Sequence, residues 1–216
     1  SSFFLPLDRI ERAFNLIQQD KSVTRGTLQT VFEHKAYDEL RRLGLTGETE
    51  ALTRHSFPRQ TGMLTVQQVI PDSPADGKLE PGDILVRVDG ELVTEFIPLA
   101  VILDVNVGES VDIELERGGR SITERIGIDD LHEISPDEFL EFGDAIVHDL
   151  SYQQARHYNQ AIEGVYVANP GYILSRAAIP RGAIVSEVAG ESVLNIIDLR
   201  LQLAKLADGD RATFRY

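Results

Sequence analysis

Apolar and polar residues alternate along segment 81–90, and the same pattern returns one hundred positions later in segment 181–190. This alternation predicts a half-buried strand in each copy. The glycines at the two ends of the strand recur at matching places: Gly82, Gly90, Gly182 and Gly190. We expect turns there, with backbone conformations that are unfavourable for other residues. Apolar helices predicted at 96–104 and 196–206 keep the same offset. The sequence therefore predicts two copies of one domain.

The remaining periodic segments predict further elements around the two repeated units. Helices are expected at 7–17, 37–43, 48–57 and 152–158, and strands at 23–32, 62–70, 111–115, 122–128, 142–147 and 164–168. The first helix has no counterpart ahead of the second copy, so we expect it to belong to, or dock on, another part of the protein. The second copy stops at the equivalent of 113–115, so we expect it to lack its last strand and to keep an open edge.

Composition narrows the class of protein. The 216 residues are 42% hydrophobic and 26% charged, which is ordinary for a globular protein, and the length and the repeat favour two domains of about 100 residues each. The predicted strands and helices favour a mainly β, α+β fold. The net charge of -14 disfavours nucleic-acid and anionic membrane partners. Absence of cysteine excludes disulfides and thiol catalysis, and no histidine pair has the spacing of a zinc motif, so no metal or cofactor is expected.

The first repeated unit resembles a PDZ domain. The matching residues are Leu79, Pro81, Gly82, Asp83, Ile84, Leu85, Val88, Asp89 and Gly90. Segments 1–9, 25–32 and 151–158 are similar to HtrA-like serine proteases, and most closely to the fungal nuclear, pro-apoptotic serine proteases of that family. The second unit departs from the signature, because Ala183 and Ala189 replace the two aspartates.

This resemblance implies an organisation of the chain. Residues 1–20 would form the end of a protease domain and a linker helix, 21–128 a first PDZ domain, 129–135 a linker, and 136–216 a second PDZ-like domain. Each would be a small β-barrel or sandwich with about two helices. The resemblance also implies an intracellular, nuclear location and a link to apoptosis.

The resemblance further implies where a peptide would bind. A PDZ domain adds an extended peptide to the edge of its sheet, beside a helix, and a loop of backbone N–H groups captures the terminal carboxylate. Carried onto the first copy, the loop and edge strand comprise Arg25, Gly26, Thr27, Leu28, Gln29, Thr30 and Val31, and the helix wall comprises Leu99, Ile102 and Leu103. Each wall residue could equally be part of the core. Gln29 and Thr30 depart from the usual loop, which carries a small residue and then a large apolar one.

The corresponding loop of the second copy, 141–145, contains Glu141 and Asp144. Two carboxylates would repel a peptide terminus, so we expect this copy to be architectural. No glycine-rich serine turn of the kind that serine proteases need is present, so the chain itself is expected to lack catalysis.

The expected partners are peptide or protein C-termini, extended segments and the missing protease domain, and a homo-oligomer is possible. The alternative is a structural module whose grooves are closed by neighbouring segments and which mediates oligomerisation or domain packing.

Overall fold

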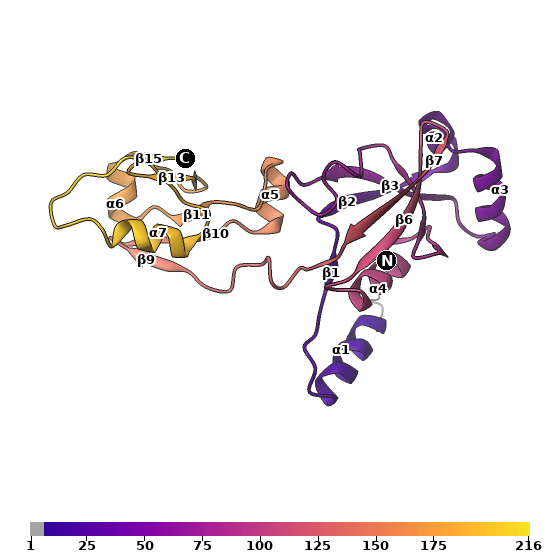
Figure 1. Cartoon of the computed structure of the whole chain (residues 1–216), viewed down its shortest axis with the longest axis horizontal. Helices are drawn as coiled ribbons and strands as arrows, with labels where there is room; N and C mark the ends of the chain where they lie inside the picture. The colour runs from indigo at the N-terminus through magenta and orange to yellow at the C-terminus, as the bar shows by residue number, and fades with distance from the viewer. Residues whose placement is uncertain (1–6) are drawn as a thin grey trace, which may run out of the picture. The chain divides into compact units, whose positions relative to one another are not determined.

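The structure, a computed structural model, describes residues 7–216 (Figure 1). The chain divides into two units. One holds the chain up to Val69 together with Ser73–His132, and the other holds Ile70–Asp72 with Glu133–Tyr216. The junction segment predicted at 1–20 lies within the described part only from residue 7 onward. The mixed fold of sheets and helices confirms the predicted α+β class.

The first unit is built around an antiparallel sheet with the strand order β2-β3-β4-β6-β7. Its strands are β2 (Thr30–Ala36), β3 (Gly62–Val69), β4 (Ile84–Val88), β6 (Ser110–Arg117) and β7 (Arg120–Gly127), with β5 (Glu91–Leu92) paired to β4. A separate two-stranded ribbon pairs β1 (Gly26–Thr27) with β8 (Asp129–Asp130). The segment predicted as a linker at 129–135 therefore begins with a strand.

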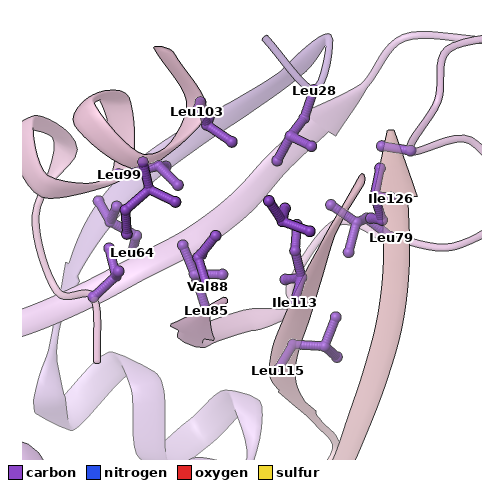
Figure 2. Close-up of a cluster of buried hydrophobic side chains, with 14 of the residues drawn as sticks. Leu28, Leu64, Leu79, Leu85, Val88, Leu99, Leu103, Ile113, Leu115 and Ile126 are labelled. Atoms are coloured by element: carbon purple, nitrogen blue, oxygen red, sulfur yellow. The ribbon is translucent and has the colours of Figure 1, made fainter. Parts of the chain in front are cut away.

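The sheet of the first unit has a hydrophobic cluster on each face, because successive side chains of a strand point in opposite directions. In β4, Ile84 and Val86 join one cluster, whereas Leu85 and Val88 join the other, because the β4–β6 register shifts between Leu85 and Arg87 and the alternation is broken there. The first cluster is covered by α4 (Phe96–Val105), whose Leu99 and Leu103 face Leu28 and Leu64 in Figure 2.

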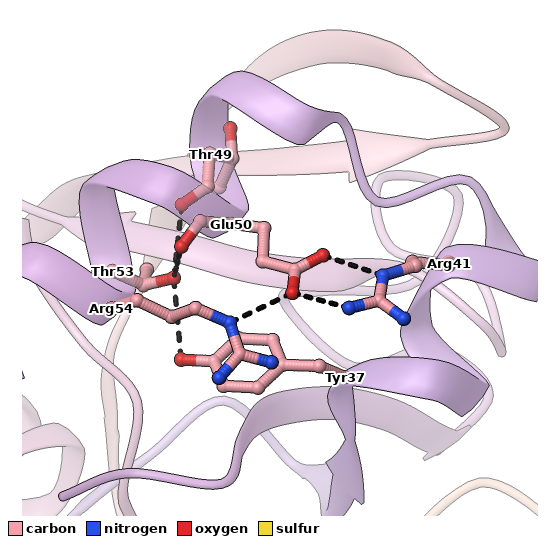
Figure 3. A network of polar contacts seen from close by, with 6 residues as sticks. All are labelled: Tyr37, Arg41, Thr49, Glu50, Thr53 and Arg54. Atoms are coloured by element: carbon pink, nitrogen blue, oxygen red, sulfur yellow. Dashed lines mark hydrogen bonds and ion pairs between the residues drawn. The ribbon is translucent and has the colours of Figure 1, made fainter. Parts of the chain in front are cut away.

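The second cluster is covered by an insertion of two helices between β2 and β3. These are α2 (Tyr37–Leu43), which contributes the buried Tyr37 and Leu40, and α3 (Gly47–Ser56). Glu50 ties the two helices together, since its carboxylate accepts hydrogen bonds from Arg41 and from Arg54 (Figure 3). The remaining helix, α1 (Asp8–Gln18), exposes the apolar side chains of Ile10, Phe14 and Ile17.

The second unit contains a four-stranded and a three-stranded sheet. The first has the order β12-β11-β10-β9 and the second the order β14-β13-β15. Their strands are β9 (Leu140–Phe142), β10 (Ala145–Asp149), β11 (Val165–Asn169), β12 (Ile184–Val185), β13 (Glu187–Val188), β14 (Glu191–Ser192) and β15 (Phe214–Arg215). The helices are α5 (Tyr152–Tyr158), α6 (Gly171–Arg176) and α7 (Ile196–Leu203).

The two units share backbone geometry across the repeat. The four bounding glycines have positive φ, as their places in the repeat predict: Gly82 (98°), Gly90 (80°), Gly182 (87°) and Gly190 (88°). Asp89 and Ala189 also match, with φ of 51° and 53°, although an alanine has no side-chain oxygen to support that conformation. The helix predicted at 96–104 is α4, whereas the one predicted at 196–206 ends earlier, because α7 stops at Leu203.

Candidate functional site

The exposed edge of β2 is the first component of the site. Among the described residues β2 pairs with β3 alone, so its other edge keeps unpaired backbone groups available to another strand. The β2–β3 register shifts between Val31 and Phe32, which places a bulge near the start of the strand. An edge of this kind permits strand addition.

The loop at the start of β2 packs against the C-terminal end of α4. Gly26 comes so close to the helix that an added Cβ would lie 2.1 Å from the carbonyl oxygen of Leu103. Only glycine permits this approach. The Gly26 N–H donates to Asp104 Oδ1 at 2.9 Å, so the loop and the last turn of α4 are also joined by a polar contact.

Arg12 of α1 strengthens the same junction. Its guanidinium donates to the backbone oxygens of Asp104 (2.6 Å) and Thr24 (2.8 Å), and Thr24 Oγ1 donates to Asp104 O at 3.1 Å. The last turn of α4 contains no basic residue of its own. Because a helix C-terminus carries partial negative charge, Arg12 supplies the cation that the helix sequence lacks.

Gln29 holds the loop in a left-handed conformation. Its φ is 53°, close to the 52° of Gly143 in the second unit, although a side chain makes this conformation costly. The Gln29 N–H donates to Thr27 Oγ1 (2.9 Å) and the side-chain Nε2 donates to Asp129 Oδ2 (2.7 Å). These two bonds help Gln29 occupy a place where the usual PDZ loop has a small residue.

The predicted wall residues lie in the core. Leu28, Leu99, Ile102 and Leu103 belong to the cluster between the sheet and α4, and none of them is more than 8% exposed. Val31, Thr27 and Gln29 are also buried, Thr30 is half-buried, and Arg25 is exposed. The structure thus brings the predicted loop and wall together, but the wall offers little free apolar surface.

A hollow lies at the other end of α4 and was not predicted from the sequence. It has a volume of about 390 Å³ and is lined by His34, Gln60, Thr61, Glu95, Phe96 and Ile97. His34 comes from β2, whereas the half-exposed Phe96 and Ile97 come from the first turn of α4. Because α4 is apolar at nearly every position, no pattern in the sequence distinguishes the exposed Phe96 from its buried neighbours.

The second unit differs at the equivalent edge. There β10 pairs with β11 on one side and with β9 on the other, in the register Ala145↔Phe142 and Val147↔Leu140. The predicted loop 141–145 is therefore the tip of a hairpin, with Gly143 and Asp144 at positive φ. The strand predicted at 142–147 is interrupted by this turn.

Two other features, a metal-binding cluster and a membrane-spanning helix, are absent from the part of the chain that the structure describes. Among residues 7–216, no three histidine or acidic side chains gather closely enough to hold a metal ion. None of the described helices combines the length and the apolar character needed to cross a membrane.

Comparisons with known proteins identify relatives of both domains. The sequence model described as "PDZ domain" matches residues 65–117, and that described as "PDZ-like domain" matches residues 133–209. The chain is similar over its whole length to "Protease Do-like 7" of Arabidopsis thaliana (47% identical) and to "Pro-apoptotic serine protease nma111" of Aspergillus terreus (42% identical), and it spans 21% of each. Among solved structures it is similar to "HtrA-type protease AlgW with decapeptide", with a TM-score of 0.44 and 20% identity over 58% of this chain and 35% of that one. The chain belongs to the PDZ domain family: it contains two PDZ domains in tandem and is similar to part of the two proteases named above.

Proposed function

We propose that the first domain, 21–128, binds extended polypeptides as an added strand on the free edge of β2. One observation carries the proposal: β2 has a partner on one side only, and His34 of this strand lines a hollow together with Phe96 and Ile97 of α4. The loop 25–29 lies at the C-terminal end of α4, where Gly26 contacts Asp104, and the hollow with Phe96 lies at the N-terminal end of the helix. A ligand would thus run the length of the helix, with the backbone of β2 providing affinity.

The predicted site residues take different roles in this proposal. Arg25, Gly26, Thr27, Leu28 and Gln29 shape the loop, and Thr30 and Val31 begin the edge strand. Leu99, Ile102 and Leu103 are buried, so they hold α4 against the sheet and do not contact the ligand directly. Phe96 and Ile97, which are exposed beside His34, contact the side chains of the ligand.

The second domain, 136–216, is architectural in this proposal. The edge of β10 that would accept a peptide is already paired with β9 of the same chain. This observation favours the closed-groove module for the second domain, while the open edge of β2 favours peptide binding for the first.

The two domains together would regulate a larger HtrA-type serine protease. Both relatives named above are proteases, and the chain spans only 21% of each of them. Catalysis is therefore assigned to another part of the parent protein. We also propose that the parent protein is located in the nucleus, and imaging of the tagged full-length protein tests this.

Nuclear magnetic resonance titration of the whole 216-residue chain tests the binding proposal. A diverse peptide library should yield ligands that shift the amide signals of β2 saturably and leave those of β10 unchanged. Phe96→Ala should weaken binding at least about fivefold, because it removes exposed apolar area at the groove. Val105→Ala is the matched control, since Val105 is exposed on the same helix outside the hollow. A library that produces no saturable shift in β2 overturns the proposal.

A further inference from the structure

We infer that the first domain selects internal extended segments and discriminates against free C-termini. This inference rests on the binding proposal and specifies its ligand class. It depends on two properties of the loop 25–29: three of its five N–H groups donate to oxygens of the chain itself, and aspartate carboxylates accept hydrogen bonds from it.

Three N–H groups of the loop have acceptors within the chain. Arg25 N donates to Asp130 Oδ1 (3.0 Å), Gly26 N donates to Asp104 Oδ1 (2.9 Å), and Gln29 N donates to Thr27 Oγ1 (2.9 Å). Two of these acceptors are carboxylates, the chemical group that such a loop would otherwise capture from a ligand. A peptide terminus would have to displace them to reach the same donors, and each displaced carboxylate would lose a charge-assisted hydrogen bond.

The charge around the loop also opposes a terminal carboxylate. Asp104, Asp129 and Asp130 all accept hydrogen bonds from loop residues, so three negative charges lie at hydrogen-bond distance from it. Asp104 is only 5% exposed, so its charge is poorly screened. The C-terminal end of α4 adds partial negative charge at the same place. An internal segment presents a neutral peptide group there and avoids the repulsion.

Arg25 and Arg12 are the described cations next to this cluster. Arg12 is engaged with the backbone oxygens of Asp104 and Thr24. Arg25 is exposed to solvent, where its attraction for a carboxylate is weakened by water and salt. One exposed cation does not offset three aspartates, so the net charge around the loop is negative.

A random heptapeptide library displayed in two formats tests the inference. In one format each peptide ends in a free carboxylate, and in the other it continues into a Gly-Ser spacer. We expect the spacer format to yield ligands of β2, and each selected peptide to bind at least as tightly as an amide as it does as a free acid. Ligands from the free-carboxylate format that bind about tenfold more tightly as acids than as amides overturn the inference and leave strand addition intact. Failure of both formats to yield any ligand of β2 overturns the binding proposal and this inference with it.

A charge-removing variant identifies the residues responsible. Asp104→Asn, Asp129→Asn and Asp130→Asn together keep a side-chain oxygen at each place while removing three charges. The affinity for the acid peptides should rise roughly threefold to tenfold relative to the amides. A variant with the same net charge, Asp38→Asn with Glu39→Gln and Glu48→Gln on exposed sites of α2 and α3, should leave that ratio unchanged. If both variants change the ratio equally, the aspartates at the loop have no specific role, and amide spectra show whether the fold is retained.

Discussion

Arg117 and Asp83 form a bidentate ion pair, with Arg117 Nε 2.7 Å from Asp83 Oδ1 and Arg117 Nη2 2.8 Å from Asp83 Oδ2. Asp83 is the aspartate of the first repeat unit, and its Oδ2 also accepts the Glu80 N–H at 2.8 Å. The pair joins the turn before β4 to the end of β6 and raises the pKa of Arg117. The second unit has Ala183 at this place and therefore lacks the carboxylate.

This geometry predicts unequal effects of removing the two partners. Asp83 is 1% exposed, so Arg117→Ala leaves a buried unpaired carboxylate and should cost about 3 to 5 kcal/mol of unfolding free energy. The Arg117 side chain is 31% exposed, so Asp83→Ala leaves a cation that water can reach and should cost roughly 1 to 2 kcal/mol. Urea unfolding followed by amide signals of the first domain measures both. Equal losses contradict the prediction, and the double variant gives the coupling energy of the pair.

Replacing Gly26 by alanine should separate the loop from α4. The added Cβ would lie 2.1 Å from Leu103 O and 2.8 Å from Asp104 N, and both are backbone atoms that cannot rotate away. We expect a loss of about 2 to 3 kcal/mol, with faster amide exchange at the end of α4. Gly47→Ala is the control, because nothing lies within 4 Å of its Cβ position and alanine favours the helix. A Gly26→Ala variant as stable as the parent chain contradicts the close packing.

The repeat made most of the first domain predictable from sequence. Alternation and turn glycines are local signals, so β4, β6, β7 and α4 were expected close to their actual bounds. The aspartates around the loop were not expected. Asp104, Asp129 and Asp130 lie 78 to 105 positions from the loop residues they bind, and no local pattern encodes contacts at that separation.

The second domain shows a different reason for a missed element. Segment 142–147 is predicted from the sequence to form one strand. The positive φ of Gly143 and Asp144 divides it into β9 and β10. A glycine inside a strand pattern can indicate a bulge, a close approach or a hairpin turn, and only pairing with neighbouring strands distinguishes these cases.

Glu116 of β6 should anchor the helical insertion to the sheet. This carboxylate is only 4% exposed and accepts hydrogen bonds from Thr46 N (2.8 Å), Thr46 Oγ1 (2.7 Å) and Thr49 Oγ1. Glu116→Ala removes the common acceptor of these donors, so we expect a loss of about 2 to 4 kcal/mol and faster amide exchange in α3. Glu114→Ala on the same strand should cost little, because Glu114 forms only a half-exposed ion pair with Arg87. Unchanged exchange in α3 after Glu116→Ala contradicts the anchoring role.

Glu50 should make the insertion sensitive to acid. Hydrogen bonds from Arg41 outweigh the opposing effect of burial and, together with Arg54, lower the pKa of Glu50 from 4.5 to about 2. Because the folded pKa is the lower one, the stabilisation is fully present above about pH 4.5 and is lost as the pH falls towards 2. Compared with Glu50→Gln, the parent chain should be more stable by about 0.5 to 1 kcal/mol at pH 6, and the difference should shrink below pH 4.5. Glu48→Gln provides the control, because Glu48 shares the first turn of α3, and hence its macrodipole, without the two arginines. A difference between the parent and Glu50→Gln that stays constant from pH 6 to pH 2.5 contradicts this account of the network.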